Sequence, residues 1–171
     1  MEPFIRIANK NDSSAIASLV NAAYRPGTNK SGWTHESEIV DGDRISIEQV
    51  NALFSEISLL FVAVEDKKII ACVHLAIEGD SGHIGMLATD PEIQAKGWGK
   101  LMLENAESYA MDKCAVKRFE MVVISQRTEL VSFYLRRGYK RTGNVEAYPM
   151  SANVGVPKST ELTVERLVKY A

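Results

Sequence analysis

The stretch LLFVAVEDKKIIACVHLAIEGDSGHIGMLATD, residues 59–90, decides the fold. It contains three apolar runs rich in strand-forming residues, which are residues 59–65, 68–78 and 82–90. The runs are separated only by the short turns DK and GDS, and turns of this length suit hairpins between antiparallel strands. The stretch therefore predicts three antiparallel strands in sequence order.

The residues before this stretch predict a strand and two helices. PFIRIA, residues 3–8, alternates as a short strand, and Asp12 can cap a helix whose apolar residues fall on one face. Ser46 and Gln49 have capping-box spacing, which predicts the start of a second helix. Residues 25–45 between the helices have no period and many turn residues, so we expect a long loop, a kind of segment that often binds ligands.

The residues after the stretch predict two more helices and three more strands. The predicted helices span about 97–111 and 127–137, and the predicted strands span 118–125, 138–143 and 161–168. Together with the first half, this order predicts an α+β fold with a mixed, mostly antiparallel sheet flanked by helices.

Composition sets the broad class of the protein. The chain has 171 residues, 46% of them hydrophobic, and no linker-like stretch divides it, so residues 1–171 predict a single domain. A net charge of -2 argues against nucleic acid as a partner. No apolar run reaches membrane-spanning length and no signal peptide is evident, so we expect no membrane partner. Cys72 and Cys114 lie in apolar segments and form no disulfide framework, which favours a cytoplasmic location.

QAKGWGKLM, residues 94–102, places two glycines before a predicted helix. A P-loop needs a glycine where Gln94 stands and a Ser or Thr where Leu101 stands, so this pattern is excluded. A dinucleotide fingerprint needs a third glycine where Met102 stands, so this pattern is excluded as well. What remains is a strand, a turn and a helix whose first amides lack internal partners and can bind an anion. A purely structural role of the glycines in the turn is the alternative.

Gln94-x-x-Gly97-x-Gly99 resembles the acetyl-CoA pyrophosphate motif of the GNAT N-acetyltransferase superfamily. The preceding MLATDP, residues 86–91, is similar to the strand end that leads into this motif. RTELVSFYLRRGYKRTG, residues 127–143, resembles the family's second cofactor segment, with Tyr134 shortly before Gly138-Tyr139. The order of the predicted elements also fits the family over nearly the whole chain.

This resemblance implies a GNAT-like acyl-CoA N-acyltransferase fold with a V-shaped opening between the strands at 82–90 and 118–125. It implies that acetyl-CoA is the cosubstrate, without a metal, and that the pantetheine arm lies in the opening like an extra strand. The implied cofactor-binding residues are Leu87, Ala88, Thr89, Gln94, Ala95, Lys96, Gly97, Trp98, Gly99 and Lys100. The amide of Leu87 is also the implied oxyanion donor.

The resemblance further implies a role for Tyr134, which matches the tyrosine that protonates the departing CoA thiolate. Core packing beside Leu130 and Phe133 is the structural alternative for this residue. Arg127 stands where many family members have a pantetheine-binding asparagine. Arginine has only donors, so it could reach a carbonyl or a phosphate but could not reproduce the paired contacts of an amide. We include it among the cofactor-binding residues, with its role open.

The attacking amine must lose a proton, because a lysine-like amine is almost wholly protonated at neutral pH. His83 stands where the histone-acetylating branch of the family has a glutamate as general base, and imidazole suits this task. His74 in the neighbouring strand, the loop acids Glu36 and Glu38, and water are the alternatives.

The sequence thus predicts an N-acetyltransferase that transfers acetyl from acetyl-CoA to a primary amine by direct attack in a ternary complex. A catalytically silent acyl-CoA-binding module is the alternative from another class. The acceptor itself is not predicted, because in this family the acceptor site is built by variable loops, here 25–45 and 144–160. Assembly into a homodimer is left open.

Overall fold

The computed structural model of the chain describes residues 2–24, 40–41, 44–93, 96–148, 156–157 and 162–171. The strands of the large sheet are β1 (Phe4–Ile7), β3 (Ser58–Glu65), β4 (Lys68–Glu78), β5 (Ser81–Thr89), β6 (Arg118–Ile124), β7 (Lys140–Ala147) and β9 (Thr163–Tyr170). A separate two-stranded sheet consists of β2 (Val40–Asp41) and β8 (Val156–Pro157). The helices are α1 (Ser13–Tyr24), α2 (Ile47–Asn51), α3 (Trp98–Cys114) and α4 (Thr128–Arg136).

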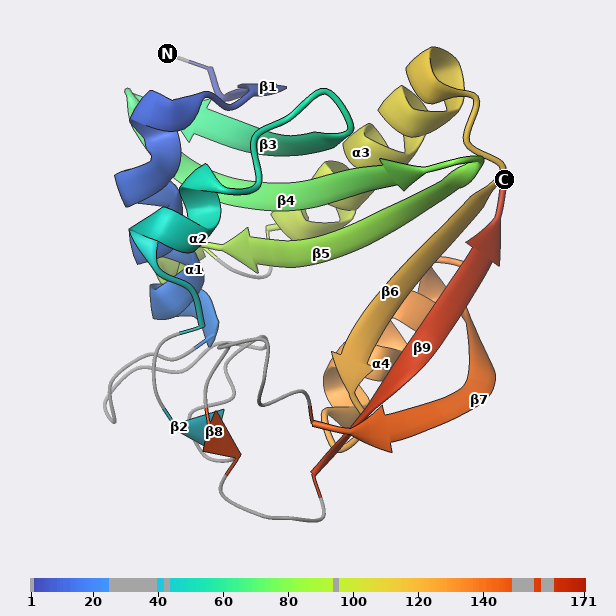
Figure 1. Cartoon of the computed structure of the whole chain (residues 1–171). Coiled ribbons are helices and arrows are strands. Elements are labelled where there is room, and N and C mark those ends of the chain that lie inside the picture. The colour runs from blue at the N-terminus through green and yellow to red at the C-terminus, as the bar shows by residue number, and fades with distance from the viewer. Residues whose placement is uncertain (1, 25–39, 42–43, 94–95, 149–155, 158–161) are drawn as a thin grey trace.

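The large sheet has the strand order β1-β3-β4-β5-β6-β9-β7 (Figure 1). Every neighbouring pair in it is antiparallel except β5 and β6, which are parallel. The α+β class with a mixed, mostly antiparallel sheet is therefore confirmed.

Helices cover both faces of the sheet, because alternate residues of its central strands are apolar on both sides. On β4, Val73 packs in the cluster that contains Met102 of α3 and Leu130 of α4. The adjacent Cys72 packs in the opposite cluster with Val20 of α1. One face thus belongs to α3 and α4, and the other to α1 and α2.

The first hairpin turn has the predicted geometry. Asp66 and Lys67 both have positive φ angles, 49° and 66°, and they connect Glu65 to its cross-strand partner Lys68. Two consecutive left-handed residues define the turn type whose twist matches that of paired strands. The capping box of Ser46 and Gln49 at the start of α2 is also confirmed.

Some predicted boundaries are wrong. Asp12 does not stand at the N-cap: its carboxylate accepts from the Asn9 amide at 2.9 Å and pairs with Arg6 at 2.8 Å. β7 runs to Ala147, well beyond the predicted end at residue 143, because all its side chains are exposed and no alternation marks it. α3 continues to Cys114, where Ala115 adopts a left-handed conformation in place of the usual glycine.

The feature of the fold that creates the site is the separation of β5 from β6. These strands pair only over Ser81–His83 on β5, and beyond this point they diverge (Figure 1). Met86 has a φ angle of 48°, and the register of β4 against β5 shifts beside it. Such a bulge bends a strand. The opening therefore lies between the two strands for which the resemblance implied it.

Candidate active site

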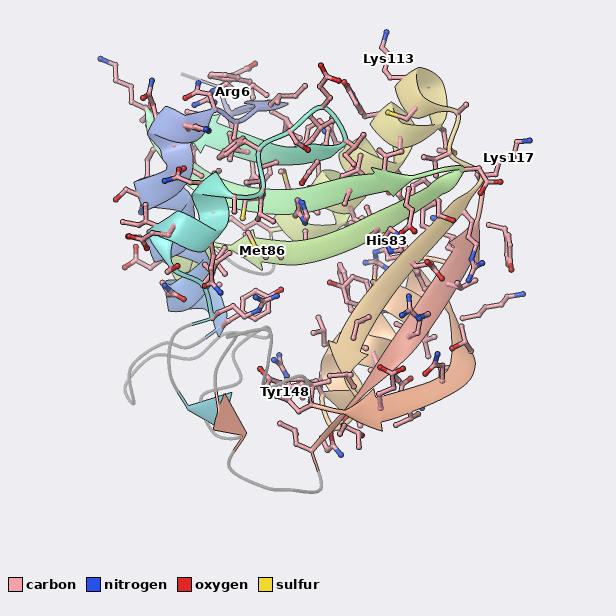
Figure 2. All side chains as sticks on the ribbon, viewed as in Figure 1. Arg6, His83, Met86, Lys113, Lys117 and Tyr148 are labelled. Carbon is pink, nitrogen blue, oxygen red and sulfur yellow. The ribbon has the colours of Figure 1, made fainter. Side chains whose placement is uncertain are left out.

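A cavity of about 260 Å³ lies in the opening between β5 and β6. Its lining comes from both faces of the sheet, since Leu130 and Tyr134 belong to α4, whereas Tyr24 belongs to α1. The other described lining residues are Arg44, Ile84, Gly85, Met86, Met121, Val122, Val123, Ile124, Tyr148 and Val164. In Figure 2, Met86 and Tyr148 lie on opposite sides of this opening. A ligand in the cavity can therefore be reached from both faces.

The edge of β5 that borders the opening carries backbone groups without a strand partner. The Asp90 amide donates to the Ile70 carbonyl on β4 at 2.8 Å. Because the amides and carbonyls of successive residues in a strand point to opposite sides, those of Thr89 and Leu87 point away from β4. The Leu87 carbonyl accepts a hydrogen bond from the Tyr24 hydroxyl at 2.9 Å. On this geometry the Leu87 amide faces the opening, and its carbonyl is already bound.

Tyr134 lines the same cavity. Its ring packs edge to face against Phe133 and Tyr139, with centroids 5.3 Å and 6.0 Å away. Burial raises the pKa of Tyr134 well above its ordinary value, Tyr24 raises it further, and the charge of Arg127 opposes the shift. The hydroxyl therefore stays protonated at neutral pH, which is the form that a proton donor needs. Within the described part of the chain, no other side chain hydrogen-bonds this hydroxyl.

A second cavity, of about 480 Å³, lies where the glycine turn meets α4. Its lining residues are Thr89, Gly97, Trp98, Gly99, Lys100, Glu129, Phe133, Arg136 and Arg137. Gly97 is the N-cap of α3, has a φ angle of 84° and provides no side-chain cap. Apart from its chain neighbours, nothing lies within 4 Å of the position that a β-carbon would take there. The first amides of a 17-residue helix thus face a cavity together with three cationic side chains. These groups fit a pyrophosphate.

The predicted cofactor residues that the structure describes on β5 and at the start of α3 fall into three groups. Thr89, Gly97, Trp98, Gly99 and Lys100 line the second cavity, whereas Leu87 and Ala88 are buried on β5 between the two cavities. Lys96 is exposed and directly precedes Gly97. Gln94 and Ala95 lie outside the described residues, as do the loop acids Glu36 and Glu38. The described part of the predicted set thus runs continuously from the α3 turn to the opening.

Arg127 is the N-cap residue of α4, one turn before Val131, whose amide donates to the Arg127 carbonyl at 3.0 Å. Its guanidinium is close enough to Tyr134 to oppose the rise of that hydroxyl's pKa. Arg127 is therefore a cation at the α4 side of the opening, beside the predicted proton donor.

His83 lies near the closed end of the opening, where β5 and β6 still pair (Figure 2). Its Nε2 is 3.2 Å from Glu78, and its Nδ1 is 3.6 Å from the buried carboxylate of Glu120. His83 is not among the lining residues of the cavity that holds Tyr134, and three residues lie between it and Leu87 along β5.

His74, the alternative base, lies on the α1 and α2 face opposite Gly85. Its Nε2 is 2.7 Å from the Ser58 hydroxyl, and it lines a third cavity of about 360 Å³ beneath α2. Burial, together with the charge of Arg44, lowers its pKa to about 4. His74 is therefore neutral at pH 7.

This neutral histidine predicts a loss of stability in mild acid. An unfolded histidine, with its pKa near 6.5, binds a proton between pH 6.5 and pH 4, whereas folded His74 does not. Stability should therefore fall as pH decreases through this window and level off below pH 4. Relative to His74→Gln, which can still bond Ser58 but does not titrate, the wild type should lose about 2.5 kcal/mol more between pH 7 and pH 4.5. Urea unfolding of both proteins at the two pH values measures the difference, and an equal loss in both would contradict the assignment.

Three residues of the site were not predicted individually. Tyr24 ends α1, and its bond to Leu87 joins positions 63 residues apart, which no local pattern reports. Arg44 and Tyr148 fall within the two stretches expected to build the acceptor site, and that expectation was the only signal for them.

The described residues have neither a candidate metal site nor a candidate membrane span. They contain no group of three or more His, Cys, Asp or Glu side chains that could hold a metal ion. No helix among them is long and apolar enough to cross a membrane.

Comparison with solved structures supports the fold. The ribosomal-protein-S18-alanine N-acetyltransferase of Escherichia coli superposes with a TM-score of 0.75 at 16% identity, covering 99% of this chain and 94% of that one. The PaiA N-acetyltransferase of Thermoplasma acidophilum, solved with coenzyme A, gives 0.71 at 18% identity, covering all of both chains. A spermidine/spermine N-acetyltransferase of Vibrio cholerae gives 0.68 at 15% identity, covering 99% of this chain and 92% of that one.

Comparison at the level of sequence identifies the family. No curated protein matches the chain. The family model of the acetyltransferase (GNAT) domain matches residues 34–148, which is well over half of the chain. This match, together with the fold and a cavity suited to pyrophosphate, shows that the chain belongs to the GNAT family of acetyl-CoA-dependent N-acetyltransferases.

Proposed function

We propose that residues 1–171 form a single-domain enzyme that transfers acetyl from acetyl-CoA to a primary amine, by direct attack in a ternary complex. One observation carries the proposal: Tyr134 and Tyr24 line the same cavity, and the Tyr24 hydroxyl bonds the Leu87 carbonyl on the open edge of β5. The cavity is lined from both faces of the sheet, so the two substrates can occupy it together.

Acetyl-CoA would bind along the α3 and α4 face. Its pyrophosphate fits the amides that begin α3, with Lys100, Arg136 and Arg137 as cations around the same cavity. From there the pantetheine arm can follow the open edge of β5, from Thr89 to Leu87, as an added strand would. The thioester then lies in the opening, within reach of Tyr134.

The amine would approach from the α1 and α2 face. Its nitrogen attacks the thioester carbonyl, forms the C–N bond and places negative charge on the carbonyl oxygen, which the Leu87 amide can stabilise. The C–S bond then breaks, and the thiolate takes the proton of the Tyr134 hydroxyl. The tyrosine recovers a proton from solvent.

The proton lost by the amine needs an acceptor on the same face, and His83 is our candidate. Its ring lies between the carboxylates of Glu78 and Glu120, with Nε2 3.2 Å from the first and Nδ1 3.6 Å from the second. Because His83 is outside the cavity lining, water must carry the proton to it.

Replacing His83 by Gln should lower kcat about tenfold, which is less than the 10²–10⁴ of a base in direct contact, because water can partly replace a remote acceptor. The affinity for acetyl-CoA should not change. Steady-state kinetics with calorimetric binding of acetyl-CoA measure both quantities. A normal kcat in His83→Gln would leave water, His74 or the loop acids Glu36 and Glu38 as the acceptor.

Release of free thiol from acetyl-CoA, measured over a panel of amines, peptides and polyamines, tests the proposed function. We expect thiol release that depends on one class of amine and equals the acetylated amine formed, as measured by mass spectrometry. If acetyl-CoA binds tightly and no amine accelerates release, the chain is instead a silent acyl-CoA-binding module.

We propose that the reaction takes place in the cytoplasm. Both cysteines, Cys72 and Cys114, are free in the structure, and burial raises the pKa of the Cys72 thiol to about 12. A thiol in this state is unreactive at neutral pH, which suits a packing role in a reducing compartment.

A further inference from the structure

Arg44 is the charged residue of the acceptor side. It lines both the cavity that holds Tyr134 and the third cavity beneath α2. Among the described lining residues of these two cavities it is the one permanent charge, since His74 is neutral at pH 7 and the others are uncharged. The described part of the acceptor side is therefore cationic.

The backbone that carries Arg44 is held firmly in place. The side-chain oxygen of Asn21, on α1, accepts hydrogen bonds from the amides of Arg44 and Ile45 at 2.8 Å and 3.0 Å. The amide nitrogen of Asn21 donates to the Ile45 carbonyl at 2.9 Å. Three bonds from one side chain thus fix the position from which the guanidinium extends.

Tyr24 connects Arg44 to the reacting edge of β5. The guanidinium lies over the Tyr24 ring, 5.5 Å from its centroid, and the hydroxyl of the same ring bonds the Leu87 carbonyl. The cation and the predicted site of acyl transfer are therefore within the reach of one tyrosine side chain. A ligand that touches both must carry its two functional groups only a few bonds apart.

The guanidinium has no carboxylate partner among the described residues. A half-buried arginine is stabilised by a planar anion, and its two parallel N–H groups match a carboxylate. The walls of the third cavity are mostly apolar, with Ile45, Leu53 and Met86, and besides Arg44 its polar lining residues are Gln49 and His74. Both features favour an acceptor with one carboxylate and an apolar side chain.

We propose that the acceptor is an apolar α-amino acid whose carboxylate is bound by Arg44. This inference rests on the proposed amine acetylation, and it names the substrate class of the same site. The amine would lie toward Leu87 and Tyr134, and the apolar side chain toward the cavity beneath α2.

Two ligands that differ only in charge test the proposal in the wild type. Leucine and leucinamide share the amine and the side chain, but leucinamide has no carboxylate. We expect kcat/KM to be at least tenfold higher for leucine, as a lost charge-assisted hydrogen bond predicts. The ammonium of leucinamide is a stronger acid than that of leucine, so at neutral pH a larger fraction of leucinamide is the reactive free amine. This difference favours leucinamide and therefore works against the result that we expect.

Variants of Arg44 test the residue itself. Arg44→Met should lower kcat/KM for leucine about ten- to a hundredfold and change kcat/KM for leucinamide less than about threefold. Arg44→Lys keeps the charge but not the paired donors, so its loss for leucine should be smaller. Unchanged thermal unfolding and unchanged acetyl-CoA affinity are the controls for an intact fold.

The failure of this inference is distinguishable from that of the proposed function. If leucinamide or a polyamine is acetylated as efficiently as leucine, or if Arg44→Met has normal leucine kinetics, acetylation stands and the carboxylate site is overturned.

Calorimetric titration of leucine into the CoA-bound protein, where no reaction occurs, measures recognition of the amino acid alone. Binding that Arg44→Met abolishes, without acetylation of any amine, supports the carboxylate site and overturns the proposed function. The absence of both binding and acetylation overturns both.

Discussion

Replacing Gly99 by Glu should raise the dissociation constant of acetyl-CoA about a thousandfold. Gly99 is buried in the first turn of α3 and lines the cavity assigned to the pyrophosphate. A carboxylate about 4 Å from a phosphate, at an effective dielectric constant near 20, costs about 4 kcal/mol, or about three powers of ten in affinity. Isothermal calorimetry measures this loss.

Gly99→Gln is the matched control, because it adds nearly the same bulk without the charge. We expect it to bind more weakly than the wild type and more tightly than Gly99→Glu. Gly99 lies within α3 and its φ angle is not positive, so a side chain there does not strain the backbone. A folded Gly99→Glu protein with wild-type affinity for acetyl-CoA would contradict the assignment of the pyrophosphate to this turn.

Removing the Tyr134 hydroxyl should lower kcat by about one to three powers of ten. This loss is at the lower end of the effects expected for general acid catalysis, or below them. The loss should be partial, because a thiolate with a pKa near 8.5 is already a fair leaving group at neutral pH. Tyr134→Phe keeps the ring that packs on Phe133 and Tyr139, so stability should change little. Steady-state kinetics at saturating acetyl-CoA measure the effect.

Tyr24→Phe is the control for Tyr134→Phe, because both substitutions delete a hydroxyl from the same cavity. The Tyr24 hydroxyl bonds the Leu87 carbonyl, so its loss should disturb the position of β5 rather than proton transfer. We therefore expect a pH-independent defect in Tyr24→Phe. A pH dependence equal to that of Tyr134→Phe would show that the assay does not report on proton donation.

The core elements of the fold could be predicted because their apolar periods are local. β4 has its predicted limits, Lys68–Glu78, since both of its faces are covered by helices and its interior is apolar apart from His74. The edge strand β7 has no buried side chain, so nothing in its sequence marks its end. The bulge at Met86 was not predictable, because methionine has no preference for a positive φ angle and the strain is imposed by tertiary contacts.

The candidate site was predictable where it depends on the backbone and unpredictable where it depends on distant contacts. Gly97 and Gly99 mark the turn because glycine, which has no side chain, leaves the helix N-terminus open to a ligand. Tyr24 and Arg44 reach the opening through contacts with Leu87 and Asn21, which lie far from them in the sequence. These contacts exist only once the sheet and α1 are assembled.

The pH dependence of the ratio of wild-type kcat to Tyr134→Phe kcat, from pH 7 to pH 9.5, tests most directly whether Tyr134 protonates the departing thiolate. The pKa of Tyr134 lies well above its ordinary value, so the tyrosine itself does not titrate in this range. The free-amine fraction changes equally in both proteins and cancels in the ratio. We predict a ratio of at least ten at pH 7 that declines above about pH 8.5, where the thiolate no longer needs a proton. A ratio of one at pH 7, with acetyl transfer shown to limit the rate, would contradict the account.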